Sequence, residues 1–159
     1  MWRKGAALFT FLGAFTDPDP TVAQRFLQRW PDVDIVEIHK PFRGLAVRFQ
    51  RPSYDPSEED LPEPISTGVR EISRQTPGVR FVLLRTECWG GSCCNWGQFI
   101  VNGAVVVNEP CVQVKDINNL EPDGVLRKLI GYFDVDIGPS EIFEPLAGGF
   151  PWNSVREEN

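Results

Sequence analysis

The chain has 159 residues, of which 42% are hydrophobic and 24% are charged. This length and composition predict one globular domain over residues 1–159 and exclude a disordered or fibrous protein. The net charge of −6 excludes non-specific binding to nucleic acid or to an anionic membrane as the main role, because phosphate groups repel an acidic chain.

The first element is an apolar run at Ala7–Phe15, and its high content of Phe is typical of a central strand. Arg3 and Lys4 precede it, so a secretion signal is the alternative. We favour the strand because no good cleavage site follows the run. No apolar stretch reaches the roughly 18 residues of a membrane span. The sequence therefore predicts a cytoplasmic protein.

Five further elements follow up to residue 90, and the spacing of their apolar residues predicts their type. They are a helix at Pro20–Trp30, strands at Asp34–Lys40 and Leu45–Gln50, a helix at Ile65–Gln75 and a strand at Val79–Trp89. The first helix has capping residues, because Asp19 can accept hydrogen bonds at its start and Pro20 suits its first position. The order β-α-β-β-α-β over residues 1–90 is that of a ferredoxin-like split βαβ unit.

The sequence from residue 91 onwards predicts two strands that extend this sheet, followed by C-terminal helices. Residues 91–108 contain two strands, Trp96–Val101 and Ala104–Val107, joined by the strong hairpin signal Asn102-Gly103. Residues 116–147 contain the predicted helices Pro122–Phe133 and Pro139–Leu146, and residues 148–159 form a tail. We therefore expect an α+β fold with a mainly antiparallel six-stranded sheet and helices packed largely on one face.

His39 is the only histidine, which excludes metal sites built from several histidines. In the predicted strands, His39 lies on the face opposite Val36 and Ile38, whereas Cys88 is in phase with the apolar Leu84. The sheet would therefore separate His39 from Cys88, and a Cys-His pair is not expected. No set of residues supplies a nucleophile, a base and oxyanion donors together, so we predict a protein without enzymatic activity.

The four cysteines have several possible roles. The spacing C-x4-C-C-x16-C of Cys88, Cys93, Cys94 and Cys111 lacks the paired C-x2-C of most zinc sites. A disulfide between Cys88 and either Cys93 or Cys94 is possible, and a reactive thiolate lacks a nearby helix start or cation. We favour reduced, buried thiols and predict no metal and no cofactor. A thiol-based redox or zinc-binding protein that uses these four cysteines is the alternative function.

Residues 105–159 carry all of the excess negative charge, with ten acidic and four basic side chains. A cationic protein partner is expected to bind at acidic residues there, namely Asp134, Asp136, Glu141 and Glu144. Trp89 and Trp96, predicted near strand ends, are candidate anchors for the same interface. The alternatives are a solvated acidic face and aromatic side chains packed beneath their own loops.

One stretch resembles a known class of proteins. Thr86-Glu-Cys-Trp-Gly-Gly is followed by a strand pair with an Asn-Gly turn and then by Ile117-Asn-Asn-Leu before a predicted helix. Over residues 79–146 this pattern resembles small acidic bacterial proteins of polymorphic toxin systems that are proposed to act as immunity proteins. The resemblance implies a binding module that occludes a basic toxin domain. Cys93 and Cys94 depart from the small or polar residues that those proteins usually have there.

Overall fold

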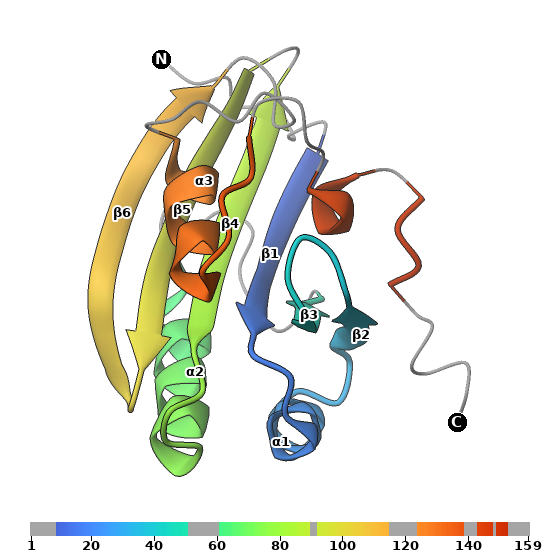
Figure 1. Cartoon of the computed structure of the whole chain (residues 1–159), viewed down its shortest axis with the longest axis vertical. Coiled ribbons are helices and arrows are strands. Elements are labelled where there is room, and N and C mark those ends of the chain that lie inside the picture. Colours follow the sequence, from blue (N-terminus) through green and yellow to red (C-terminus); the bar gives the residue numbers. More distant parts are fainter. Residues whose placement is uncertain are drawn as a thin grey trace.

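A computed structural model gives the fold and describes residues 9–50, 61–89, 92–114, 124–138, 143–147 and 149–152. Six strands form one sheet in the order β2-β3-β1-β4-β5-β6, and all neighbouring strands are antiparallel (Figure 1). The elements are β1 (Phe9–Thr16), α1 (Pro20–Arg29), β2 (Asp34–Ile38), β3 (Gly44–Arg48), α2 (Glu63–Gln75), β4 (Phe81–Trp89), β5 (Ser92–Val101), β6 (Ala104–Val114), α3 (Val125–Ile130) and the 3₁₀ turns η1 (Gly131–Phe133) and η2 (Glu144–Leu146).

The local signals for β1, α1 and the hairpin are confirmed. β1 lies inside the sheet, between β3 and β4. At the start of α1, the Asp19 carboxylate accepts hydrogen bonds from the backbone N–H groups of Thr21 and Val22. Asn102 and Gly103 have φ of 53° and 79°. Positive φ at both central residues is what a type I′ hairpin turn requires.

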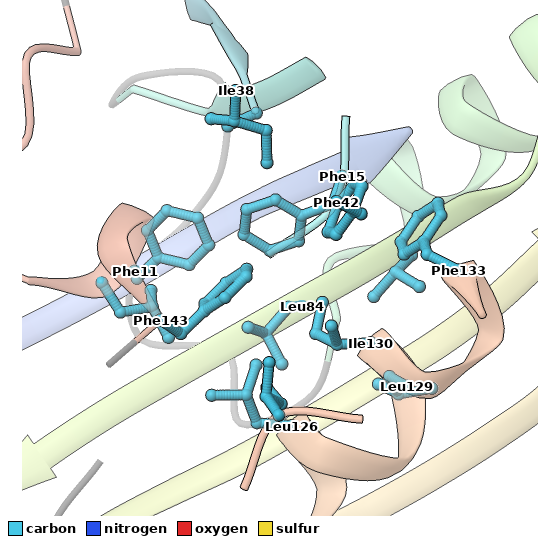
Figure 2. Packing of buried hydrophobic residues seen from close by; sticks show 14 of the residues in the cluster. Phe11, Phe15, Ile38, Phe42, Leu84, Leu126, Leu129, Ile130, Phe133 and Phe143 are labelled. Carbon is cyan, nitrogen blue, oxygen red and sulfur yellow. The ribbon is translucent and has the colours of Figure 1, made fainter. Parts of the chain in front are cut away.

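Hydrophobic cores cover both faces of the sheet, so the expectation of helices largely on one face is wrong. On one face, α1 and α2 pack Val22, Phe26, Ile65 and Val69 against strand residues such as Leu12 and Leu83. On the other face, α3, η1 and the segment after residue 143 cover strand residues such as Phe11, Phe15 and Leu84 (Figure 2). The physical reason is that β1 and β4 carry apolar side chains on alternate faces, and both sets must leave water.

The C-terminal elements are shorter than predicted. α3 ends at Ile130, and the chain continues as the 3₁₀ turn η1 until Asp134, which has a φ of 65°. Of the predicted helix Pro139–Leu146, residues 139–142 lie outside the described part of the chain, Phe143 is extended, and η2 spans only Glu144–Leu146. The segment from Phe143 to Trp152 still contributes to the core, because Phe143 packs on Phe15 and Trp152 on Phe11.

β5 and β6 are longer than predicted. β5 begins at Ser92, opposite Trp89, and β6 continues to Val114. A β-bulge interrupts their ladder where Pro110 and Cys111 face the single residue Trp96, because Asn95 pairs with Val112 and Gly97 with Glu109. The added ends, residues 92–95 and 108–114, contain Asn and Pro, which are depleted in strands. Among the helices in the described residues, none is long and apolar enough to cross a membrane.

Gly13 generates a stability prediction. A Cβ at this position in β1 would overlap the carbonyl oxygen of Val47 in β3 and the ring of Phe11. We expect Gly13→Ala to lower the free energy of unfolding by about 1–3 kcal/mol, measured by urea denaturation, because a backbone oxygen cannot move away without breaking the ladder. Gly131→Ala is the control, since a Cβ there meets no atom within 4 Å, and it should leave stability unchanged or slightly higher. Equal stabilities of the two variants would contradict the close approach of β1 and β3.

Candidate binding groove and disulfide cluster

A shallow groove lies where α3 and η1 pack beside β6. It has a volume of about 460 Å³ and is lined by Glu109, Arg127, Lys128, Gly131, Tyr132, Val135 and Asp136. Close packing of α3 on the sheet depends on Gly97 of β5, because a Cβ there would overlap the side chain of Leu129. The groove therefore combines residues of the consecutive elements α3 and η1 with Glu109 of the edge strand β6, which comes earlier in the sequence.

Tyr132 is the aromatic side chain of this groove. Its ring stacks on Phe99 of β5 with a centroid distance of 4.2 Å and an interplanar angle of 10°. Phe99 is buried, whereas Tyr132 remains 38% exposed. The stack holds the exposed ring in one orientation, so a partner would not have to order it on binding. Sequence analysis missed Tyr132, whose only signal is an aromatic residue outside the apolar stripe of its helix.

Two of the four acidic side chains predicted to bind a partner, Asp134 and Asp136, are already paired within the chain. Both carboxylate oxygens of Asp136 accept hydrogen bonds from Arg127, at 2.8 and 3.0 Å. These bonds hold the pKa of Asp136 below its ordinary value and raise the pKa of Arg127. Asp134 accepts a hydrogen bond of 2.7 Å from Arg80. Their side chains remain 86% (Asp134) and 74% (Asp136) exposed.

Arg80 also fastens η1 to the sheet. Its guanidinium donates to Asp17 at the end of β1 and to the backbone carbonyl of Tyr132, and it lies over the ring of Phe133. Hydrogen bonds to Asp17, and secondarily to Asp134, raise the pKa of Arg80 above its ordinary value. This network holds the backbone of Tyr132 in place and so stabilises the side of the groove that η1 forms.

The remaining predicted binding residues do not gather at the groove. Trp96 pairs with Arg85, which is in phase with Leu83, so it lies on the face that α1 and α2 cover. Trp96 is half-buried, and the guanidinium of Arg85 lies 5.7 Å from its ring. Glu144 is exposed in η2. Glu141 and the side chain of Trp89 lie outside the described part of the structure.

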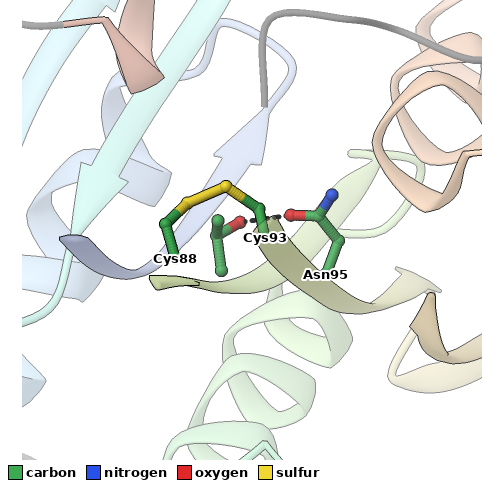
Figure 3. The surroundings of a disulfide bond; sticks show 4 residues. Cys88, Cys93 and Asn95 are labelled. Carbon is green, nitrogen blue, oxygen red and sulfur yellow. Dashed lines mark hydrogen bonds between the residues drawn. A yellow bond between two sulfur atoms is a disulfide. The ribbon is translucent and has the colours of Figure 1, made fainter. Parts of the chain in front are cut away.

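The four cysteines form two disulfide bonds, which corrects the expectation of reduced thiols. Cys88 in β4 is bonded to Cys93 directly opposite in β5, and their Cα atoms are 4.0 Å apart (Figure 3). Cys94 is bonded to Cys111 in β6. The reason is that β5 begins before the predicted strand, which places Cys93 opposite Cys88. No cysteine is left free, and the described residues contain no cluster of three or more metal-binding side chains.

Polar groups surround both bonds. Beside Cys88–Cys93, the hydroxyl of Thr86 donates a 2.7 Å hydrogen bond to the side-chain oxygen of Asn95, and both residues are buried. On the opposite face, the buried Arg85 donates to Glu87 at 2.7 Å. His39 lies directly after β2 and is exposed.

Comparison with known proteins gives no match to a protein family, a curated protein or a solved structure. The resemblance to immunity proteins of toxin systems therefore stays a prediction from the sequence pattern.

The Asp136–Arg127 pair generates a prediction about pH. Because the pKa of Asp136 is lowered in the folded protein, its carboxylate favours the folded state at neutral pH, and this contribution disappears as pH falls through the folded pKa. We expect Arg127→Gln to raise the pKa of Asp136 towards its ordinary value, measured by NMR titration of the side-chain carboxyl. Arg29→Gln, which removes the distant pair with Glu71, is the control and should leave the pKa of Asp136 in place. An Asp136 pKa that is the same in all three proteins would exclude the pair in solution.

Proposed function

We propose that the chain is a non-catalytic protein-binding module that docks its partner in the groove between η1 and β6. The exposed but immobilised ring of Tyr132 is the observation that carries this proposal. Aromatic side chains near the centre of an interface contribute most of its binding free energy, particularly when they lose little conformational freedom on binding. The charged residues around the ring, including Glu109 and Asp136, would form the polar rim of such an interface.

The proposed partner is a basic protein domain, such as a toxin that the chain occludes as an immunity protein. Its support is the net charge of −6 and the sequence resemblance over residues 79–146. The ion pairs of Asp134 and Asp136 reduce what these side chains can add to contact energy, because each already has an arginine partner. The acidic excess would instead act at longer range and accelerate the encounter with a cationic surface.

We also propose that β1 to β4 with α1 and α2 form a ferredoxin-like split βαβ unit, to which β5 and β6 are added. The support is that β3 lies between β2 and β1 in the sheet. In addition, α1 and α2 pack against the same core. In this arrangement the proposed docking groove is built by the added elements.

The second candidate function is a thiol-based redox or zinc-binding protein, favoured by two disulfides joined through the neighbouring Cys93 and Cys94. Zinc binding would require reduction first, because thiolates are the ligands. A thiol count and a metal assay, each with and without a reductant, separate this candidate from a binding module.

The first test concerns Tyr132. The protein is co-purified with the product of the neighbouring gene, and dissociation is then measured by surface plasmon resonance. We expect Tyr132→Ala to raise the Kd by about thirtyfold, corresponding to about 2 kcal/mol, through faster dissociation, and Tyr132→Phe to retain most of the affinity.

Phe9→Ala is the matched control, because Phe9 is also 38% exposed and lies in β1, away from the groove residues. It should leave the Kd unchanged. Thermal midpoints of all variants verify folding. If no neighbouring gene product binds, or if Phe9→Ala weakens binding as much as Tyr132→Ala does, the docking proposal is wrong.

The second test concerns charge. We expect the double variant Asp134→Asn, Asp136→Asn to slow association and flatten its dependence on salt, because Asp136 lines the groove and the exposed Asp134 lies two residues before it, so both attract a cationic partner that approaches the groove. The double variant Glu63→Gln, Glu71→Gln is the control, since these exposed carboxylates of α2 also pair with arginines. Equal association rates for the two double variants would mean that the acidic end is only a solvated face.

A further inference from the structure

The hydrophobic cores contribute little to the disulfide-bearing end of the sheet, where the partly buried Val112 of β6 packs against one cluster. β4 contributes Phe81 to Leu84 to the two buried clusters, and the next contribution along the chain comes from Phe99 of β5. No described residue between 85 and 98 belongs to either cluster. Figure 1 shows the ends of β4, β5 and β6 at this side of the sheet reaching past α2 and α3. We call residues 85–89, 92–96 and 110–114 the distal end.

Helix α2, which covers one face of the sheet, does not extend over the distal end. The side chain of Ser66, near the start of α2, hydrogen-bonds to Gln98, and that of Ser73, near its end, accepts from the backbone N–H of Gly103. α2 therefore runs beside β5 from Gln98 towards the hairpin turn and away from the cysteines. The buried side chains of the distal end are largely polar, namely Arg85, Thr86 and Asn95, together with Cys93 and Cys94. Covalent bonds here add to a sparse apolar packing.

The pleat of the sheet keeps the two bonds apart. Cys88–Cys93 is on the face of Leu84 and Thr86, and Cys94 is on the face of Arg85 and Trp96, because neighbouring residues of a strand point to opposite faces. A thiol at Cys93 or Cys94 therefore cannot attack the other disulfide while the strands stay paired. Each bond opens without exchange into the other.

Exposure distinguishes the two bonds. Cys111 is exposed in the bulge of β6, whereas Cys93 is buried and Cys88 is half-buried. Reduction begins when a thiolate attacks an accessible disulfide sulfur, so the Sγ atom of Cys111 is the first target and the Cys94 thiolate is the leaving group. A dithiol reductant then completes the step: it gives two electrons and two protons, the bond becomes two thiols, and the reductant becomes a disulfide.

We propose that the distal end is a redox-controlled unit, in which the two disulfides hold β4, β5 and β6 together while the cores hold the rest of the chain. Such bonds form and persist in an oxidising compartment and are opened where dithiols are maintained, as in the cytosol. The protein with both bonds intact therefore belongs to an oxidising compartment, unlike the cytoplasmic protein that the sequence predicted.

The state of the Cys94–Cys111 bond also affects the groove, an inference that rests on the function proposed above. Glu109 lines the groove and lies two residues before Cys111. Opening of Cys94–Cys111 would release the part of β6 that carries Glu109, and so weaken docking. The redox-controlled unit is tested without any partner, so a negative result of that test can be distinguished from a failure of the docking proposal.

The experiment measures hydrogen exchange by mass spectrometry on the full chain, purified under oxidising conditions, with and without dithiothreitol. We expect reduction to accelerate exchange of the distal-end peptides by roughly tenfold or more, since loss of a disulfide costs several factors of ten in a local opening equilibrium. Peptides from β1, β3 and α2 should keep their protection. Timed alkylation should label Cys94 and Cys111 before Cys88 and Cys93.

The double variants separate the two bonds. Cys94→Ser with Cys111→Ser should accelerate exchange at the β5–β6 end without a reductant, and Cys88→Ser with Cys93→Ser should do so at the β4–β5 end. If a variant fails to fold, the reduction series on the unaltered chain decides alone. Unchanged exchange on reduction, loss of protection over the whole chain, or four free thiols in the oxidised protein would each overturn the proposal.

Discussion

The need to cover both faces of β1 and β4 determines most of this structure. Phe11 and Phe15 point to one face of β1, and Leu12 and Ala14 point to the other. A sheet whose central strands are apolar on both sides is stable only with a layer on each side. α1 and α2 form one layer, and α3 with the segment after residue 143 forms the second. The pairing of Arg80 with Asp17 and Asp134 fastens the second layer to the sheet.

The same alternation organises the distal end, to which the cores contribute few residues. It separates Cys93 from Cys94 and so directs each cysteine to a different partner strand. It also places Trp96 on the face away from the groove. Cys93 and Cys94 therefore lie on opposite faces of the sheet although they are adjacent in the sequence. For the same reason, one interface cannot contain both Trp96 and the groove.

The groove shows how packing creates a candidate interface that charge alone does not indicate. Asp134 and Asp136 are exposed, yet an arginine already bonds one carboxylate oxygen of Asp134 and both oxygens of Asp136. Tyr132 carries no charge, but its stack on Phe99 makes it the rigid exposed ring of the groove. Net charge would then influence how fast a partner arrives, and Tyr132 how long it stays.

The sequence by itself determined the type and order of the elements up to β4, the Asp19 cap and the Asn102-Gly103 turn, because these depend on neighbouring residues and on a local apolar period. It also placed β1 inside the sheet. Only the tertiary structure decided the two-sided cores, the length of β5 and β6, the disulfide pairs and the groove around Tyr132. Each of these depends on contacts between residues far apart in the chain, such as Phe99 with Tyr132 and Arg80 with Asp17, which no local pattern encodes.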